Sequence, residues 1–539
     1  MDEHQLSVLM QSLTSAITSV FGESSIVNVK KRNKKLKEGD FVVSVSGDQC
    51  GRDLQWTHQT KVRLSKDREV MCVSSNFTND KLFVSLERKT MMQILISEVT
   101  TKGQQYGQHC VKPKSIVLLA NPLLLHEHTE DLSLESMRSI LTSFYVSQLL
   151  GANSCMVCCP VLNKKLLADL NVLWEPLLEE LKDLSASDIF QSEELAILKQ
   201  EFLQTLSSSE YVLPTDVSHV STNKIKIDGE KFILNIGHGE KFSKNIKVVN
   251  YHKDSVAVSD VVSLELCKRR NYSAGVRVIC VHVVPKSMEY QHQLVELGWK
   301  LFCSDVNLKQ KSIVCNTVNT QKVGGVLVLP SVSELIHQRK MQMKEAFESK
   351  YGMDEANSGY SLQIDKLTTA AMKFDFLLSS HSSILKLDVS KANTKGGVFV
   401  MYNYARLSTL FSRFETSVSE GIYPELPDHD HIDYSLLKEE EEWELLFNFV
   451  LVYPSIIQDA AVSILSDHPR LPVLIHTLCK FLQDLSFNLS SYYNRVHVLT
   501  EPYPHLLPTM YARLHLLKSV HQVMHNGLGM LKIQPLEAL

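Results

Sequence analysis

Apolar residues recur at helical spacing between residues 398 and 414. They form one stripe, at Val400, Tyr404, Leu407, Phe411 and Phe414. At about 100° per residue, Tyr402, Arg406 and Arg413 fall together in a narrow arc on the opposite side. The pattern predicts a helix that joins a core on one face and presents an aromatic ring beside two guanidinium groups on the other. Such a face suits a nucleotide backbone with unstacked bases, although a core helix with ordinary solvated arginines has the same spacing.

The first 112 residues mix helix and strand patterns, which predicts a small α+β domain. An amphipathic helix is expected at the start, with its apolar side formed by Leu6, Leu9, Met10, Leu13, Ile17 and Val20. Residues 41–45 and 81–86 have the composition of strands, and a helix is expected near residues 90–99.

The pattern becomes α/β from residue 115, and we assign residues 113–345 to a second domain. Residues 115–120 and 276–284 read as buried strands, and residues 134–150 as a helix that Gly151 ends. A second helix with apolar residues at Leu294 and Leu297 follows the later strand. Strands that alternate with helices predict a parallel, Rossmann-like sheet.

Residues 346–539 are predicted to form an all-α domain. The charged residues 340–365 are expected to be a linker into it, and residues 416–442, with two prolines, a long connection between helices. Helices are predicted around residues 443–452 and 456–465, from Pro472 through Leu485, and from Pro508 to a stop at Asn526-Gly527. The fold class is therefore multidomain, combining α+β, α/β and all-α units.

The composition is that of an ordinary globular protein, with 44% hydrophobic and 22% charged residues in 539. The N-terminus lacks the regions of a signal peptide, and no run of about 18 apolar residues occurs. We therefore expect a soluble cytoplasmic protein without a membrane partner. The 11 cysteines, an odd number, indicate reduced thiols, and the CxxC pair Cys155 and Cys158 is interpreted as buried strand cysteines.

A net charge of −4 does not by itself indicate nucleic-acid binding, but the charge is segregated along the chain. Six cations fall within eight residues, at Lys30, Lys31, Arg32, Lys34, Lys35 and Lys37. They could neutralise several phosphates, and a solvated surface segment is the alternative. The acidic run formed by Glu439 to Glu442 and Glu444 is interpreted as a solvated segment.

The segment Met401 to Leu407 resembles the tyrosine, alanine and arginine motif of the anticodon-binding bundle of arginyl-tRNA synthetases, the DALR domain. Three further segments resemble that bundle in the same order, at residues 370–373, 492–495 and 512–531. Residues 77–83 and Tyr106-Gly107 resemble the end of the N-terminal tRNA-contacting domain of these enzymes. The resemblance implies a degenerate class I synthetase-like middle domain between the two.

The resemblance also implies which side chains contact tRNA. We expect the anticodon arm to meet residues from two segments, namely Tyr402, Asn403, Arg406, Arg413, Tyr492, Tyr493, Asn494 and Arg495. The six cations between Lys30 and Lys37 are expected to meet the tRNA backbone. Asn403 and Tyr404 replace an alanine and a histidine of the synthetase pattern, and Ala370 replaces its aspartate, so individual base contacts differ.

The two phosphate-binding signatures of a class I synthetase look dismantled. Residues 121–129 keep an Asn-Pro and some histidine where His-X-Gly-His is expected, and residues 320–325 keep one lysine of the Lys-Met-Ser-Lys-Ser loop. Near copies of both signatures lie almost adjacent in residues 235–244, where we predict a hairpin turn flanked by residues 232–234 and 246–249. No Walker loop, dinucleotide fingerprint or zinc-site pattern occurs, and His521 and His525 are interpreted as packed or surface residues. We expect no catalytic residue, no cofactor and no metal.

Over its whole length the chain resembles the family of DALR anticodon-binding domain-containing proteins. That resemblance implies a non-catalytic adaptor that binds particular arginine tRNAs. It would present them to a methyltransferase-like tRNA cytosine-3 methyltransferase, which makes 3-methylcytidine in the anticodon loop. Two alternatives remain open: an active arginyl-tRNA ligase with cryptic motifs, and a protein-interaction scaffold that binds no RNA.

Overall fold

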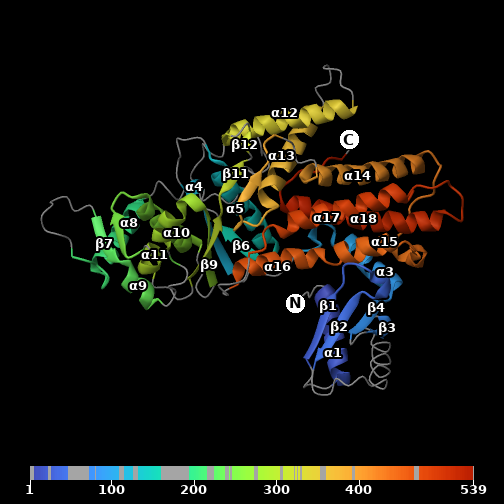
Figure 1. The fold of residues 1–539 in the computed structure, drawn as a ribbon, viewed down its shortest axis with the longest axis horizontal. Helices are drawn as coiled ribbons and strands as arrows, with labels where there is room; N and C mark the ends of the chain where they lie inside the picture. Colours follow the sequence, from blue (N-terminus) through green and yellow to red (C-terminus); the bar gives the residue numbers. More distant parts are fainter. Residues whose placement is uncertain are drawn as a thin grey trace.

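The computed structural model describes most of the chain, and Figure 1 shows how its parts are arranged. The described residues are 5–21, 26–46, 72–78, 81–108, 115–125, 132–158, 193–214, 224–236, 242, 246–271, 277–303, 308–320, 322–323, 326–327, 330–351, 360–390, 395–466 and 473–537. An α/β region forms one end of the molecule in Figure 1, and the C-terminal helices form the other, with the N-terminal region beneath them.

The N-terminal region is an antiparallel sheet with helices, as the sequence predicts. Its four strands lie in the order β1 (Ile26–Lys31), β2 (Phe41–Ser46), β4 (Lys81–Leu86) and β3 (Cys72–Thr78). The predicted amphipathic helix is α1 (Gln5–Phe21), which packs on β1, and α3 (Arg88–Lys102) follows β4. Alternate residues of β4, including Leu82 and Val84, are fully buried, so one face of the sheet forms the core of this region.

The middle region contains the predicted parallel sheet. Its strands lie in the order β10 (Leu308–Cys315), β9 (Arg277–Pro285), β5 (Ser115–Ala120) and β6 (Cys155–Cys158), all parallel. Val117 and Leu119 pack in the core that contains α5 (Leu134–Ala152), whereas Leu118 and Ala120 pack in a second core on the other face. Helices of that second face are α8 (Glu193–Ser208), α10 (Val256–Asn271) and α11 (Glu289–Phe302). Because both faces are covered, the central strands β5 and β9 are mainly apolar, whereas the edge strand β10 carries polar residues such as Gln310 and Ser312.

The predicted hairpin around residues 235–244 is wrong in its first arm. Residues 232–234 lie in α9 (Gly229–Asn235), and β7 (Lys224–Asp228) is the strand that pairs antiparallel with β8 (Val248–His252). The reason is local, because the Asp228 side chain accepts a hydrogen bond from the Lys231 backbone and caps a helix at this point. The glycines and lysine of the two near-signatures, residues 237–241, lie outside the described residues.

The C-terminal region is a helical bundle, and its bounds differ from the prediction at three places. The helix predicted from Pro472 begins only at Thr477, because the described residues 473–476 before it are not helical. The helices are α12 (Val332–Tyr351), α13 (Ser361–Leu377), α14 (Gly397–Ser419), α15 (Glu440–Leu445), α16 (Tyr453–Leu465), α17 (Thr477–Arg495) and α18 (Leu507–Met530). The predicted linker at 340–365 is largely helical, since α12 occupies it up to Tyr351 and α13 begins at Ser361. Helix α18 continues past the predicted stop because the Asn526 side chain donates to the Gly103 and Tyr106 carbonyls, 2.9 and 3.1 Å away.

The long connection predicted at 416–442 is confirmed between α14 and α15, where short 3₁₀ turns lie at His429–His431 and Tyr434–Leu436. Short pairs of strands complete the fold: β11 (Val318–Thr320) with β14 (Leu385–Leu387), and β12 (Lys322–Val323) with β13 (Val326–Leu327). One-turn helix α4 (Pro122–Leu125) follows β5 directly.

The N-terminal region docks firmly on the bundle through buried polar contacts. The indole N–H of Trp443 donates to Asp40 Oδ1 at 2.7 Å, and the Asp40 Oδ2 atom accepts from the Leu86 backbone at 2.8 Å. Tyr106 donates its hydroxyl to the Val450 carbonyl at 2.8 Å. Arg88 and Glu440 add a bidentate ion pair at the edge, with both N–O distances 3.0 Å. Because buried polar groups are costly to separate from their partners, this interface holds the two regions in one relative position.

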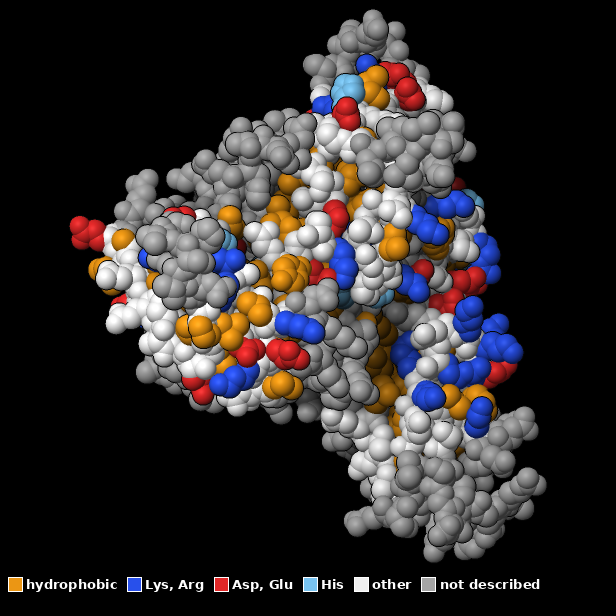
Figure 2. Space-filling view, turned by 60° about the vertical axis from the view of Figure 1, so that its left-hand side comes forward, with side chains coloured by type: hydrophobic (Ala, Val, Ile, Leu, Met, Phe, Trp, Pro, Cys, Tyr) orange, Lys and Arg blue, Asp and Glu red, His pale blue; other side chains and the backbone are white. Residues whose placement is uncertain are grey.

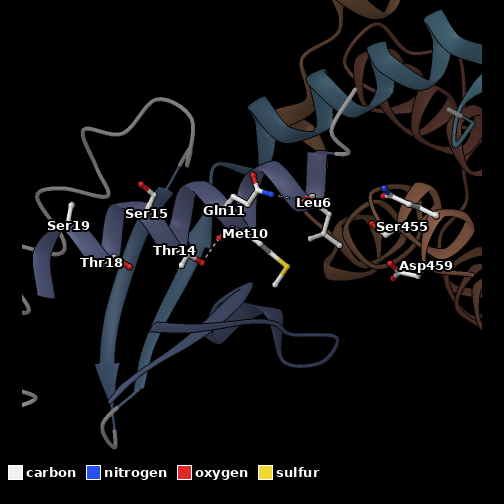
Figure 3. A pocket seen from close by; sticks show the side chains of 11 residues that line it. Leu6, Met10, Gln11, Thr14, Ser15, Thr18, Ser19, Ser455 and Asp459 are labelled. Carbon is white, nitrogen blue, oxygen red and sulfur yellow. Dashed lines mark hydrogen bonds between the residues drawn. The ribbon is translucent and has the colours of Figure 1, made fainter. Parts of the chain in front are cut away.

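A groove of about 820 Å³ lies between α1 and α16. Its α1 wall is rich in hydroxyls, and Figure 3 shows Met10 and Leu6 of α1 facing Ser455 and Asp459 of α16. The two walls show no arrangement of nucleophile and base, so we assign the groove no chemistry.

The stretch Glu440–Leu465 is long and apolar enough, by length and composition, to cross a membrane. Its apolar window is 61% buried inside the protein. Trp443 and Phe447 of this stretch stack on each other, and Phe447 also meets Phe41 of β2 edge to face. The stretch therefore packs as core helices of the bundle.

Candidate nucleic-acid interface

The guanidinium of Arg406 joins helices α14 and α17 at the bundle surface. Its carbon lies 4.1 Å from the centre of the Tyr493 ring and 6.0 Å from that of Tyr402. Its Nη2 atom donates to Asn494 Oδ1 at 2.9 Å. These four residues, Tyr402, Arg406, Tyr493 and Asn494, form what we call the Arg406 cluster. The structure therefore brings together half of the residues predicted for the anticodon arm, from two segments about 90 residues apart in the sequence.

The predicted face of α14 points outward. Val400, Tyr404 and Leu407 of the apolar stripe are buried, whereas Tyr402 and Arg406 are partly exposed and Arg413 is exposed. A planar cation between two aromatic rings, with a side-chain amide beside it, offers π faces for bases and a positive charge for phosphate.

Two predicted contact residues are buried and act inside the bundle. Asn403 is 1% exposed, and its amide donates to the Phe399 carbonyl one turn earlier at 2.9 Å. Tyr492 is fully buried, and its hydroxyl donates to Glu442 Oε1 at 3.0 Å. Both neighbour the Arg406 cluster in sequence but lie on the core side of their helices, so they position it and do not reach its surface.

Arg495, also predicted for the anticodon arm, is paired with the acidic run. Its Nη2 atom lies 2.9 Å from Glu439 and 2.5 Å from Glu441. Glu442 of the same run is fully buried and also accepts from Arg513 Nε at 2.9 Å. The run is therefore only partly the solvated segment that the sequence predicts, because Glu439 and Glu442 cap α15 reciprocally and tie it to α17 and α18.

A close approach of helices underlies the placement of α14. A Cβ atom at Gly397 would lie 2.3 Å from the Ala370 carbonyl oxygen of α13, so no larger residue fits there. The segment Ala370 to Lys373, which resembles the name-giving motif, is accordingly buried at this contact. Its role in this chain is packing.

Helix α14 also packs on the two histidines of α18. The Tyr404 ring stacks on His521 with centroids 4.1 Å apart, and the Tyr404 hydroxyl lies 3.1 Å from His525 Nδ1. Burial lowers the pKa of His521 to about 4, so this ring is neutral at physiological pH. Its Nε2 atom is 2.9 Å from the Ser408 hydroxyl. The interpretation of these histidines as packed residues is confirmed.

Sequence reasoning missed an aromatic pair beside the Arg406 cluster. The rings of Phe399 in α14 and Phe487 in α17 lie 4.8 Å apart, and Phe487 is 43% exposed. The signal was present, because Phe487 precedes Asn494 by seven residues, two helical turns, and therefore shares its face. The pair extends the aromatic surface along the seam between the two helices.

The basic segment at residues 30–37 divides into exposed and engaged cations. Lys30, Lys34, Lys35 and Lys37 are exposed. Arg32 pairs with Glu38 at 2.8 Å and lies over the Phe83 ring. Lys31 turns toward the bundle, where it lies over the Phe447 ring and donates to Asn448 Oδ1 at 2.6 Å. Burial lowers the pKa of Lys31 to about 7, so its charge is not fully available to phosphate at physiological pH.

Positive side chains gather where the bundle meets the N-terminal region. Figure 2 shows Lys and Arg concentrated at the right-hand edge of the view, whereas the α/β region at the left shows mixed charges and apolar side chains. The net charge of −4 thus conceals a local concentration of cations.

The segment after β5, where a class I synthetase binds phosphate, is apolar in the described residues that follow Asn121. Leu123, Leu124 and Leu125 of α4 are buried. Asn121 is also buried and donates to the Ser143 hydroxyl at 2.9 Å, so it serves the packing of α5. Residues 126–131, which include the remaining histidines of this signature, lie outside the described residues, as do Gln321, Gly324 and Gly325 of the second one.

Comparison with known proteins agrees with this geometry. Residues 400–539 match the DALR anticodon binding domain. The chain is 38% identical over 267 residues to DALR anticodon-binding domain-containing protein 3 of Danio rerio, which is 48% of this chain and 47% of the relative. The protein of that name from Mus musculus is 40% identical over 263 residues, 48% of each chain. The chain thus spans about half the length of the curated relatives it matches.

Synthetases are more distant relatives. An arginine–tRNA ligase of Geobacter metallireducens is 31% identical over 212 residues, 38% of this chain and 34% of the ligase. The solved arginyl-tRNA synthetase of Thermus thermophilus superposes with a TM-score of 0.59 at 15% identity, covering 98% of this chain and 100% of that chain. That of Plasmodium falciparum also gives 0.59, at 14% identity and 98% coverage of both. The predicted synthetase-like fold and the resemblance to DALR proteins are confirmed.

Proposed function

We propose that this synthetase-like anticodon-binding protein is a tRNA adaptor without aminoacylation activity. It would hold the anticodon arm of particular arginine tRNAs and present it to a methyltransferase-like enzyme that forms 3-methylcytidine in the anticodon loop. The observation that carries the proposal is the Arg406 cluster, which presents aromatic and cationic groups within the part of the chain that matches an anticodon-binding domain.

The energetic demands of this role are modest. Stacking of a base on an aromatic side chain contributes about 1–3 kcal/mol, and Tyr402, Tyr493 and the Phe399–Phe487 pair offer several such faces. Cations that contact phosphates add a salt-dependent term. Micromolar binding requires about −8 kcal/mol. Two stacked bases would contribute about 2–6 kcal/mol of this, and phosphate contacts would have to supply the rest.

The docked N-terminal region supplies a second point of contact. Its exposed cations Lys30, Lys34, Lys35 and Lys37 belong to the region that Trp443 and Asp40 fix against the bundle. A rigid spacing between the cations and the Arg406 cluster favours one folded RNA shape over flexible single strands, because both surfaces must be met at once.

Sequencing of the RNA that co-purifies with the full chain from cells tests the proposal. We expect arginine tRNAs to be enriched over total tRNA, and the same preparation of Arg406→Ala to lose them. Recovery of no RNA would favour a protein-interaction scaffold. Recovery of tRNAs without preference would support binding and contradict the selection of arginine tRNAs.

Loss of catalysis is tested separately by pyrophosphate exchange with ATP, arginine and tRNA. We expect no turnover, because the described part of the first phosphate-binding segment is filled by buried leucines. Exchange above background would favour an active ligase.

The role of the partner requires a reconstitution in which a tRNA cytosine-3 methyltransferase is assayed with and without this chain. The partner would carry the methyl donor. We expect methylation of arginine tRNA to depend on the chain, and Arg406→Ala to reduce it. We place this activity in the cytoplasm, which fractionation of cells would check.

A further inference from the structure

A second cluster of ionisable groups lies in the α/β region, away from the Arg406 cluster. His282 lies on β9, and His292 and Glu296 lie one helical turn apart on α11, the helix that follows β9. One ligand atom from each of the three lies within 4.8 Å of the others. It is the one such group found in the part of the chain that the structure describes. Spacing of i and i+4 on a helix, with a third group on the adjacent strand, is typical of metal ligands.

The neighbouring Gln310 decides which nitrogen of His282 carries its proton. The Gln310 amide nitrogen donates to the Glu296 carbonyl at 3.1 Å, so its oxygen must face His282 Nε2, 2.9 Å away. His282 Nε2 therefore donates, and the lone pair of Nδ1 is free to accept on its other side. Metal-binding histidines usually have one nitrogen held by such a carbonyl partner.

The free lone pair of His282 points at His292. The His292 Nε2 and His282 Nδ1 atoms are 2.7 Å apart, and both rings are almost completely buried. Because His282 Nε2 carries its own proton, His292 Nε2 is the donor between the two rings. A cation that replaces this one shared proton meets two nitrogen lone pairs already directed at one point.

The third group leaves the cluster open on one side. Glu296 is only half-buried, and its carboxylate accepts from the hydroxyl of Ser312, an exposed residue of β10. An ion therefore has a path from solvent to the two buried nitrogens, past the carboxylate.

We propose that His282, His292 and Glu296 bind a divalent transition-metal ion, with zinc preferred. His282 Nδ1, His292 Nε2 and a Glu296 oxygen are the ligands, and a fourth position faces the Ser312 side. Two imidazoles with one carboxylate suit zinc, and the ligand set is too rich in nitrogen for magnesium or calcium. Zinc–nitrogen bonds of about 2.0 Å at tetrahedral angles place the nitrogens about 3.3 Å apart, so the 2.7 Å separation widens slightly when the ion binds.

The ion would fasten α11 to the centre of the parallel sheet. His282 pairs in register with Ala120, the last residue of β5, so the site lies beside the end of the strand that leads into α4. The metal therefore stabilises the α/β region and contributes nothing to the bundle surface that we propose for RNA.

The experiment uses the full chain without an affinity tag. Zinc content is measured by mass spectrometry after dialysis against a low concentration of zinc, and the visible spectrum is recorded with cobalt as the probe. We expect about one equivalent of zinc, a tetrahedral cobalt spectrum, and a rise in melting temperature when zinc is added to the metal-free chain. His292→Gln and Glu296→Gln each remove a direct ligand, so we expect zinc affinity to fall by more than the roughly 10- to 100-fold that changing an outer-shell partner costs.

The matched control is His252→Gln, which replaces an exposed histidine of β8 in the same region. It should keep wild-type zinc content, and RNA binding should be unchanged in all three variants. Zinc bound adventitiously by the 11 cysteines would persist in His292→Gln and would overturn the proposal. A wild-type chain whose melting temperature does not respond to zinc would overturn it even if the variants fail to fold.

Discussion

The Arg406 guanidinium lies 4.1 Å from the centre of the Tyr493 ring, which joins residues that are 87 positions apart in the sequence. The cation is held between the ring and the Asn494 amide, so its plane is oriented before any ligand arrives. An oriented guanidinium loses less conformational entropy on binding RNA than a free arginine does.

Arg406→Ala should weaken binding of the tRNA anticodon arm and lower the slope of log affinity against log salt by about one. Arg406→Lys keeps the charge but not the planar stacking on Tyr493, so it should restore the salt slope without restoring full affinity. Titrations at several salt concentrations measure both quantities. Arg277→Ala, an exposed arginine at the start of β9, is the control. Equal affinity of Arg406→Ala and wild type at low salt would remove this face from the RNA site.

Tyr493→Ala should cost about 1–3 kcal/mol of binding free energy if the ring stacks on a base. Tyr493→Phe should bind almost as well as wild type, because the stacking surface remains. A Tyr493→Phe variant as weak as Tyr493→Ala would show that the hydroxyl is what matters, contrary to stacking. The measurement is the same titration at one fixed salt concentration.

Glu442→Ala should lower the free energy of unfolding by about 3–5 kcal/mol, since it leaves the buried side of Arg513 and the Tyr492 hydroxyl without their acceptor. Glu441→Ala is the matched change at the preceding residue of the same run, where a partly exposed carboxylate meets Arg495. It should cost less than about 1 kcal/mol. Urea unfolding followed by circular dichroism compares the two, and similar losses would mean that burial does not decide the outcome.

Gly107→Ala should separate the N-terminal region from the bundle. Gly107 has φ +90°, and a Cβ atom there would lie 2.4 Å from Cε1 of Tyr453. The clash and the strained backbone together should cost about 2–4 kcal/mol of stability. Gly103 has φ +50°, and a Cβ atom there would have nothing within 4 Å. Gly103→Ala therefore measures the cost of backbone strain without a clash, and it should lower the free energy of unfolding by about 1 kcal/mol. Loss of tRNA affinity in Gly107→Ala alone would show that the docked geometry matters for binding.

Stability should rise with pH above neutrality because of Lys373. Burial lowers the pKa of this lysine from 10.5 to about 7, and its Nζ donates to the Lys532 carbonyl. The unfolded chain binds a proton that the folded chain has lost between these two values, so unfolding becomes harder as pH rises from about 7. Below pH 7 the lysine is charged in both states and adds no slope.

Lys373→Met keeps about the same side-chain length and removes the ionisable amine. Its melting temperature should depend less on pH than that of wild type between about pH 7 and pH 9. Lys386→Met, at an exposed lysine of β14, should leave the wild-type dependence unchanged. Identical pH profiles for Lys373→Met and wild type would contradict a buried, neutral lysine.

Local patterns account for much of what could be predicted. The apolar stripe from Val400 to Phe414 identified α14 and the outward direction of Tyr402 and Arg406, because a helix repeats its faces every 3.6 residues whatever it packs against. The continuous apolar run 115–120 identified β5 as a strand buried on both faces. Resemblance to the synthetase bundle then predicted the fold of the whole chain.

Apart from the hairpin arm at residues 232–234, where the Asp228 cap is local, the following failures arose because residues from elsewhere in the chain outweighed the local signal. Helix α18 continues through Asn526 and Gly527, where the sequence predicts its end, because the Asn526 amide donates hydrogen bonds to the Gly103 and Tyr106 carbonyls. Asn403 and Tyr492 stand next to surface residues in sequence, yet their side chains turn into the core. His282 and His292 carry no recognisable motif, because their contact depends on how α11 returns over β9.

Sequence alone thus determined the types of the elements, the outward face of α14 and the synthetase-like architecture, since these depend on periodicity and on matched motifs. Only the tertiary structure decided that Arg406 meets Tyr493, that Lys31 and Arg495 are occupied by protein partners, and that two histidines face one glutamate. Pairings of this kind depend on how distant segments pack against each other, so no local stretch of sequence is sufficient to predict them.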